Sequence, residues 1–305
     1  MQPLNVLVSL ITEENDFQME QAATAQAAAA RLGVQLQIVY AANDAVNQSQ
    51  QLFTAIQSKN SRPDGILVEP VGTGMAQAAA AAVSAGIGWG VVNRDVDYIL
   101  RLRRGASSPV FAVATDHTEV GRIQATQLNA LVQNAGDVLY LEGPSSGGVA
   151  RARSFGMFAS IRKDIVVKTL KGDWTEHSGY HATKSWLSLS TSRQLNIRAI
   201  AAHNDAMAIG ARRAFEEVAD LNARREWLKL PFIGCDGVAK AGKEWVRRGL
   251  LKATVVTPPP MGEAMEILVR GIRSGVQPPE CTVSRPTSFP AVEELNASAF
   301  AQGAR

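Results

Sequence analysis

Short apolar runs alternate with long amphipathic or alanine-rich stretches along almost the whole chain, and this alternation constrains the fold most. The first run, Asn5 to Leu10, precedes an expected helix from about Phe17 to Leu32 that Gly33 ends. A second strand is expected at Gln35 to Tyr40. Strands that alternate with helices form parallel pairs, because each pair needs a helical crossover. The chain is therefore predicted to be an α/β protein with doubly wound sheets.

The alternation continues through most of the sequence. Further strands are expected at 64–68, 90–93, 110–114, 138–141, 165–170, 199–202, 232–235 and 253–256. Further helices are expected at 45–58, 75–85, 119–133, 148–161, 176–189, 206–219, 238–248 and 262–274. The segment Asp97 to Pro109 is expected to be irregular, and a proline-rich tail closes the chain. About nine or ten strands are too many for one compact sheet of this kind, so two Rossmann-like lobes are predicted.

Composition excludes several functional classes. The 31 basic and 28 acidic residues give a net charge of +3, which is too even to indicate a nucleic-acid partner. The two cysteines, Cys235 and Cys281, lie far apart, so no disulfide framework or metal site is expected. His177 and His181 stand four apart on a predicted helix, but they lack a third ligand and are expected to be surface residues. We expect no metal and no cofactor.

Polar and aromatic residues follow the predicted strands at the ends where doubly wound sheets bind ligands. These candidate ligand-binding residues are Asn15, Phe17, Glu69, Asn93, Arg94, Arg153, Trp174, Asn204, Asp236 and Thr257. Helix capping alone explains Asp116, Asp205 and the region of Thr175, because strand-to-helix turns favour such residues. Capping does not explain Arg94, Arg153 or Trp174, since none of these residue types is a turn or cap residue.

This combination of side chains suits a polyhydroxylated ligand. A guanidinium and a carboxylate can each hold two neighbouring hydroxyl groups, and a ring face can cover the C–H side of a sugar. Arg153 and Asp236 are expected to form a charge pair that partly neutralises both groups. Nucleotide binding is not favoured. Gly72-Thr73-Gly74 lacks the third glycine of a dinucleotide fingerprint, and the segment Gly143 to Gly148 lacks the Lys-Ser/Thr of a P-loop.

Several segments, in this order, carry a family resemblance. They are Asn15-Asp16-Phe17, Val91-Val92-Asn93-Arg94, Thr115-Asp116, the segment from Ala150 to Gly156, the segment from His203 to Gly210, and Gly234-Cys235-Asp236-Gly237. With these segments the chain resembles a periplasmic sugar-binding protein of the ribose-binding type, related to the effector domains of lactose-repressor-like regulators. The resemblance covers nearly the whole chain.

The resemblance implies that Asn15, Phe17 and Arg94 on one lobe, and Arg153, Asn204 and Asp236 on the other, line a sugar site. Trp174 falls where the family often has a stacking aromatic. The chain departs from the family at Glu69, Asn93 and Thr257, and has Gln18 in place of a second aromatic residue. These departures remove carboxylate and ring contacts, so they argue against ribose itself and leave a sugar or polyol as the expected class.

The resemblance also implies two lobes that are joined by three chain crossings and close around the ligand. We expect residues 1–114 plus 258–282 in the N-terminal lobe and 115–257 plus 283–305 in the C-terminal lobe. The implied role is a non-catalytic, monomeric solute-binding protein that presents its ligand to an ABC-type transporter permease, a chemoreceptor or a sensor kinase. The implied location is the periplasm, after removal of a leader peptide, although the residues alone also allow the cytoplasm.

Two other classes remain open at this point. The first is the effector domain of a lactose-repressor-like regulator, which would need a DNA-binding headpiece that the sequence before Leu4 does not contain. The full reading frame would distinguish it. The second is an enzyme on a Rossmann-like scaffold, against which the missing phosphate fingerprint argues. Turnover in a substrate screen would support it.

Overall fold

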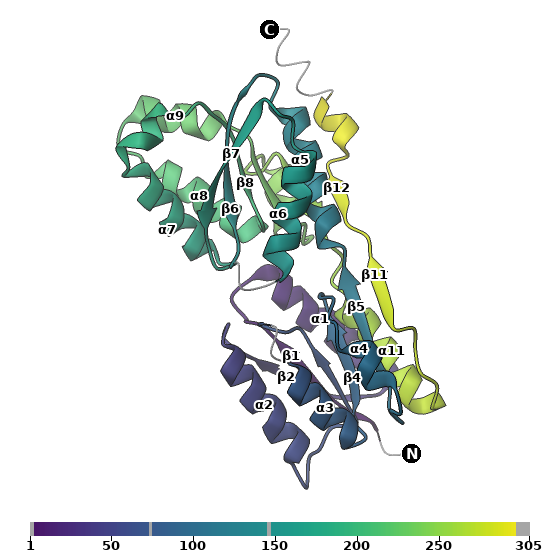
Figure 1. Cartoon of the computed structure of the whole chain (residues 1–305). Coiled ribbons are helices and arrows are strands. Elements are labelled where there is room, and N and C mark those ends of the chain that lie inside the picture. Colours follow the sequence, from purple (N-terminus) through teal and green to yellow (C-terminus); the bar gives the residue numbers. More distant parts are fainter. Residues whose placement is uncertain (1–2, 73–74, 145–147, 297–305) are drawn as a thin grey trace. The chain divides into compact units, whose positions relative to one another are not determined.

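The chain folds into two compact α/β units. The computed structural model describes residues 3–72, 75–144 and 148–296. Unit 1 comprises residues 1–115 and 259–284, and unit 2 comprises residues 116–258 and 285–305. The boundaries expected from the sequence lie one or two residues earlier, because strands β5 (Val110–Thr115) and β11 (Cys281–Ser284) run on to their unit's edge. Figure 1 shows the elements of both units.

Unit 1 contains a six-stranded sheet in the order β11-β5-β4-β3-β1-β2, and all five neighbouring pairs are parallel. Its other strands are β1 (Asn5–Leu10), β2 (Gln35–Tyr40), β3 (Gly65–Val68) and β4 (Gly88–Val92). Its helices are α1 (Asp16–Leu32), α2 (Ala45–Gln57), α3 (Ala76–Ser84), α4 (Ile99–Arg103) and α11 (Met261–Ser274). One apolar core lies between the sheet and helices α1 and α11, and a second lies between the sheet and helices α2, α3 and α4. Helices thus cover both faces, as doubly wound sheets require.

Unit 2 repeats this architecture with the sheet order β12-β10-β9-β8-β6-β7. Its strands are β6 (Gly136–Glu142), β7 (Ile165–Lys171), β8 (Ile197–Ala202), β9 (Phe232–Asp236), β10 (Ala253–Val256) and β12 (Thr287–Phe289). Its helices are α5 (His117–Leu131), α6 (Gly148–Ser160), α7 (Glu176–Leu187), the 3-10 helix η1 (Ser190–Gln194), α8 (Asp205–Glu216), α9 (Leu221–Lys229) and α10 (Gly242–Arg247). The last strand differs from its counterpart, because β12 pairs with β10 in the antiparallel direction.

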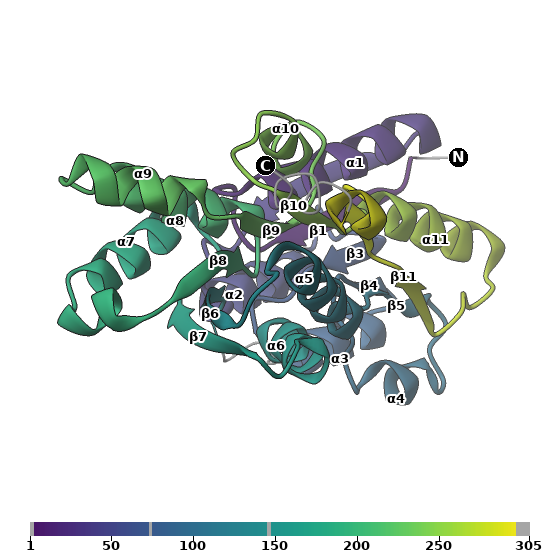
Figure 2. The same ribbon diagram turned by 90° about the horizontal axis from the view of Figure 1, so that it is seen from above.

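Glycine pairs let two helix pairs of unit 2 approach very closely. Helices α5 and α6 lie side by side in Figures 1 and 2, and they meet at Gly121 and Gly156. A Cβ atom on Gly121 would lie 1.9 Å from the Arg153 carbonyl oxygen. Helices α7 and α8 meet in the same way, and a Cβ atom on Gly210 would lie 2.0 Å from the Glu176 carbonyl oxygen. These contacts fix the helices that follow the strand ends of unit 2.

The predicted fold class is confirmed, and the departures from the predicted elements are local. The expected irregular segment 97–109 contains the short helix α4, and the stretch after α8 contains α9, which was not predicted. The described part of the proline-rich tail supplies β11 and β12. The helix expected at 238–248 is shorter and begins at Gly242. These elements are short or exposed, so their sequence periodicity is weak.

No helix in the described ranges has the length and apolar character that crossing a membrane requires.

Two glycine-containing turns considered from the sequence lie partly outside the described residues. Thr73 and Gly74 of the first turn, and residues 145–147 of the second, are not described.

Candidate functional site

The strand order places one crossover point in each sheet, where ligands of doubly wound proteins bind. Neighbouring strands β1 and β3 form this point in unit 1, and β6 and β8 form it in unit 2. The first residue after β3 is Glu69, and the first residue after β8 is His203. Each residue therefore lies at the carboxyl edge of its sheet; Glu69 is itself a sequence candidate, and His203 directly precedes the candidate Asn204.

Glu69 is the centre of a buried amide network in unit 1. Its side chain is 2% exposed, and its Oε2 accepts hydrogen bonds from Gln18 Nε2 at 2.9 Å and Gln21 Nε2 at 3.1 Å. Its Oε1 accepts one from Asn93 Nδ2 at 2.8 Å. Gln48 Nε2 donates to the Glu69 carbonyl oxygen at 2.9 Å. Because three of about four acceptor positions of the carboxylate hold protein amides, Glu69 is suited to orient neighbouring side chains.

The other unit 1 candidates lie on the same edge. Asn15 caps helix α1, and its Oδ1 accepts from the Gln18 N–H at 2.9 Å. Phe17 is only 7% exposed, so most of its ring packs inside the unit. Asn93 has a left-handed backbone with φ 62°, and its Oδ1 accepts from Thr115 Oγ1 at 2.8 Å. Arg94 follows Asn93 and is half-buried. Unit 1 thus joins Glu69 directly to Asn93, and Gln18 joins Glu69 to Asn15, because its side chain donates to Glu69 and its backbone N–H donates to Asn15.

In unit 2 the structure brings all five predicted residues together. Arg153 lies on α6 with a side chain that is 5% exposed, and its Nη2 lies 3.8 Å from Asp236 Oδ1. The expected charge pair is therefore present. The Arg153 guanidinium carbon also lies 5.5 Å from the centroid of the Trp174 ring, within range of a cation–π contact.

Trp174 is held in an unusual backbone conformation. Its φ is 75°, which is strained for a bulky side chain. Asn204, the N-cap of α8, donates from Nδ2 to the Trp174 carbonyl oxygen at 2.8 Å. Gly143 leaves room for the indole, because a Cβ atom there would lie 2.3 Å from Trp174 Cζ2. The ring position is therefore determined by several surrounding groups.

Asp236 ends β9 with φ 107°, so a second site residue of unit 2 has a strained backbone. Thr257 is buried, and its N–H donates to the Asp236 carbonyl oxygen at 3.1 Å. Thr257 therefore fixes the backbone that carries the Asp236 carboxylate. Among the described residues, three of the five non-glycine residues with positive φ are site candidates, namely Asn93, Trp174 and Asp236.

Asp205 corrects one expectation. The sequence predicts that it caps a helix, but the cap of α8 is Asn204, whose Oδ1 accepts from the Met207 N–H at 3.0 Å. Asp205 instead points into the unit and accepts from the Gly237 N–H at 2.8 Å. Burial, with the nearby Asp236 charge, raises the pKa of Asp205 well above its usual range. A Cβ atom on Gly242 would lie 1.9 Å from its Oδ2, so small residues must surround this carboxyl group.

His203 and His117 also belong to the site region of unit 2, and neither is among the sequence candidates. Arg153 donates from Nη1 to the His203 carbonyl oxygen, and its Nε lies 3.4 Å from His117 Nδ1. Burial is the main cause that lowers the pKa of His203 well below its usual value, and the Arg153 charge lowers it further. The sequence places His203 in a family landmark, but only the folded contacts assign it to this cluster.

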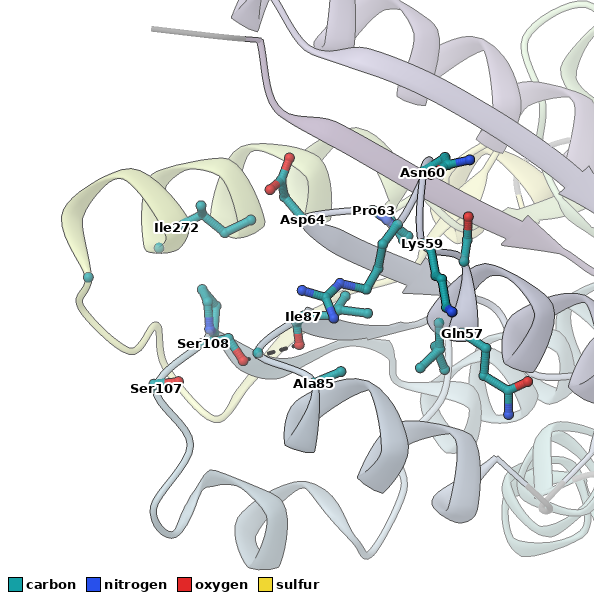
Figure 3. Close-up of a pocket in the computed structure, with 17 residues that line it drawn as sticks. Gln57, Lys59, Asn60, Pro63, Asp64, Ala85, Ile87, Ser107, Ser108 and Ile272 are labelled. Carbon is teal, nitrogen blue, oxygen red and sulfur yellow. Dashed lines mark hydrogen bonds between the residues drawn. The ribbon is translucent and has the colours of Figure 1, made fainter.

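A large cavity lies elsewhere in unit 1, at the opposite end of the sheet. It has a volume of about 810 Å³, and Figure 3 shows Lys59, Asp64 and Ser108 around it. Asp64 immediately precedes β3, and Ser108 lies shortly before β5, so these residues mark the amino ends of the strands. Lys59 and Asp64 are exposed. The cavity is thus separate from the carboxyl edge, where the candidate residues gather.

The chain is similar to known periplasmic binding proteins. The family described as "Periplasmic binding protein domain" matches residues 6–270. The D-allose-binding periplasmic protein of Escherichia coli is 27% identical over 83% of this chain and 78% of its own length. The galactofuranose-binding protein YtfQ of the same organism is 26% identical over 94% of this chain and 88% of its own length.

A solved structure shows the same fold. It is an ABC transporter periplasmic solute-binding protein from Actinobacillus succinogenes with bound D-allose, and it has a TM-score of 0.80 and 22% identity. The superposition covers 97% of this chain and 100% of that protein. The family match, which extends over both units, shows that this chain belongs to the periplasmic binding protein family.

Proposed function

We propose that this chain is a solute-binding protein for a small sugar or polyol and that each unit supplies one part of the binding site. The observation that carries the proposal is the cluster of Arg153, Trp174 and Asp236 at the carboxyl edge of unit 2. Charged groups of this kind can each hold two hydroxyls, and the indole can cover the apolar face of a sugar. The names of the relatives, which include a D-allose-binding protein, support this ligand class.

The charge balance favours an uncharged ligand. The Arg153 guanidinium already pairs with the Asp236 carboxylate, so a neutral polyol can hydrogen-bond to both without leaving a net charge buried. We propose that the ligand also contacts Asn15, Phe17 and Arg94 of unit 1. We further propose that it favours a closed arrangement of the units through three chain segments near residues 115, 258 and 284.

We propose binding without catalysis. Two titratable groups near the site already serve the fold, since His203 Nδ1 accepts from the Gly143 N–H at 2.9 Å and Asp205 accepts from the Gly237 N–H. We propose that the closed, monomeric protein acts in the periplasm and is recognised by an ABC-type importer. The family and the names of the relatives support this role.

A thermal-shift screen with D-allose, D-ribose, myo-inositol and D-glucose tests the ligand class. A ligand at a hundred times its dissociation constant stabilises the folded state by about 2.7 kcal/mol. We expect at least one of these compounds to raise the melting temperature, and we expect Asp236→Asn to lose that rise. A flat response of the wild-type protein to all four compounds would contradict the proposed ligand class.

A further inference from the structure

His203 lies behind the candidate ligand residues of unit 2. It is the first residue after β8, its side chain is fully buried, and its N–H donates to the Leu141 carbonyl oxygen at 2.8 Å. Because no part of it reaches the surface of the unit, His203 can influence a ligand only through its neighbours. Two of those neighbours are the residues best placed to contact a sugar.

The imidazole supports the Trp174 ring. The two ring centroids lie 5.8 Å apart with an interplanar angle of 22°, which is a stacked arrangement. Tyr140 packs edge-on against the same imidazole, with centroids 4.9 Å apart. Trp174 needs such support, because its backbone has a positive φ that a bulky residue rarely adopts. An unsupported ring there has other rotamers available to it.

The orientation of the imidazole is itself fixed by hydrogen bonds. Its Nδ1 accepts from the Gly143 N–H, so a neutral ring carries its proton on Nε2. Nε2 lies 3.4 Å from Ser154 Oγ, which donates to the Glu142 carboxylate. Lys171 pairs with the other oxygen of Glu142. The ring is therefore held on two sides and cannot rotate freely beneath Trp174.

The main chain of His203 holds the second ligand residue. Its carbonyl oxygen accepts from Arg153 Nη1, and the remaining terminal nitrogen of Arg153 lies beside Asp236. Arg153 Nε faces His117. The positive charge of Lys171 also lowers the pKa of His203. The guanidinium plane is thus set by groups that lie beneath it rather than by solvent.

We propose that His203 is a positioning residue, which pre-sets the Trp174 ring and the Arg153 guanidinium to receive the ligand without contacting it. This inference rests on the proposed function. It extends that function by naming a buried residue on which affinity depends. A platform ordered before binding raises affinity, because ordering it costs nothing at the moment of association.

Two substitutions of His203 separate the contributions of the ring and the acceptor. His203→Asn keeps an acceptor near the Nδ1 position but removes the ring, whereas His203→Phe keeps a ring and removes the acceptor. His181→Asn is the matched control, because His181 is an exposed histidine of α7 in the same unit. If His203→Asn does not fold, as judged by circular dichroism, His203→Gln replaces it.

Titration calorimetry with D-allose, D-ribose and myo-inositol measures the effect on affinity. We expect His203→Asn to raise the dissociation constant by roughly 10-fold or more, and His181→Asn to leave it unchanged. In a Trp174→Ala background, we expect His203→Asn to add less than about a 3-fold loss, because its effect passes largely through the missing ring. Equal losses in both backgrounds would overturn the positioning role.

A measurement without ligand keeps the two proposals distinguishable. The emission of Trp174 is the difference between the spectra of proteins with and without the substitution Trp174→Phe. We expect this emission to shift to longer wavelength in His203→Asn and to stay unchanged in His203→Phe. If the wild-type protein binds none of these three compounds or D-glucose, the proposed function fails and the emission alone decides the role of His203. An unshifted emission in His203→Asn would then overturn that role.

Discussion

Glu69 and His203 occupy equivalent positions in the two units, and their surroundings differ sharply. Glu69 directly follows β3, and its backbone N–H donates to the neighbouring strand β1 at 2.9 Å. His203 directly follows β8, and its backbone N–H donates to the neighbouring strand β6 at 2.8 Å. Around Glu69 the partners are the amides of three neutral side chains. Around His203 the partners are two aromatic rings and a guanidinium.

This difference indicates how the two edges contribute to binding. The Glu69 network is closed upon itself, because its donors and acceptors largely satisfy one another inside unit 1. The His203 cluster instead supports an indole and a charge pair that lie at the edge of unit 2. We therefore expect unit 2 to supply most of the ligand's binding free energy, and we expect the Glu69 network mainly to stabilise unit 1.

The largest expected effect is that of Arg153→Met. This substitution removes the guanidinium that pairs with Asp236, whose side chain is 13% exposed. We expect a loss of about 2–5 kcal/mol of binding free energy in titration calorimetry with a sugar that stabilises the wild-type protein. Arg151→Met is the control, because Arg151 lies on the same helix and is exposed. Similar affinities for the two variants would remove unit 2 as the main contributor.

The next largest effect tests the closed network of unit 1. In Glu69→Gln one acceptor oxygen becomes an amide donor, so at least one buried glutamine or asparagine amide loses its acceptor. We expect the free energy of unfolding to fall by about 1–3 kcal/mol in urea titrations, with little change in ligand affinity. Glu263→Gln, at an exposed position of α11, is the control. A large affinity loss without destabilisation would instead make Glu69 a direct ligand contact.

The sequence predicts the edges of both sheets well, for a physical reason. Parallel strands end at a common edge, so residues such as Arg153 and Asp236 could be expected to meet although they are far apart in the chain. The helix α9 was missed because it is short and mostly polar and none of its residues is buried, so no apolar run marks it. The strand β11 was missed because its partner, β5, lies far away in the sequence.

The contacts among the candidate residues were harder to predict than their positions at the sheet edges. Glu69 remains a predicted ligand contact, and a strand-end pattern does not reveal its three amide partners, which come from α1 and from the end of β4. His203 was seen only as part of a family landmark. The positioning role that we propose for His203 depends on the left-handed backbone of Trp174 and on the space beside Gly143, and neither is visible in the residue types alone.

A smaller effect concerns the pH dependence of the free energy of unfolding. All four histidines of the chain lie in unit 2. The pKa of His203 is lowered in the folded state, so below about pH 6.5 the unfolded state binds more protons and stability falls as the pH falls. Each pH unit changes this contribution by at most about 1.4 kcal/mol. We expect the stability difference between wild type and His203→Asn to be smaller at pH 5.5 than at pH 7.5 in urea unfolding. An equal difference at both pH values would contradict a buried neutral imidazole.

The smallest expected effect concerns backbone strain in unit 1. Ala42, in the turn before α2, has φ 53° and is exposed. Ala42→Gly relieves this strain but loosens the unfolded chain, so we expect a net stabilisation of about 0.5 kcal/mol and unchanged ligand affinity. Thermal unfolding measures the first and calorimetry the second. A change in affinity would show that strain in unit 1 also serves binding.

The most direct test of the account compares the wild-type protein with Asp236→Asn in calorimetric titrations with D-allose and myo-inositol. Asp164→Asn is the control, because Asp164 is an exposed partner of Arg162 on the same unit. We predict that the wild-type protein and Asp164→Asn bind at least one of these compounds with one site per chain and equal affinity. We predict that Asp236→Asn binds it at least about 30-fold more weakly while unfolding at a similar temperature. Equal dissociation constants for all three proteins would contradict the central claim.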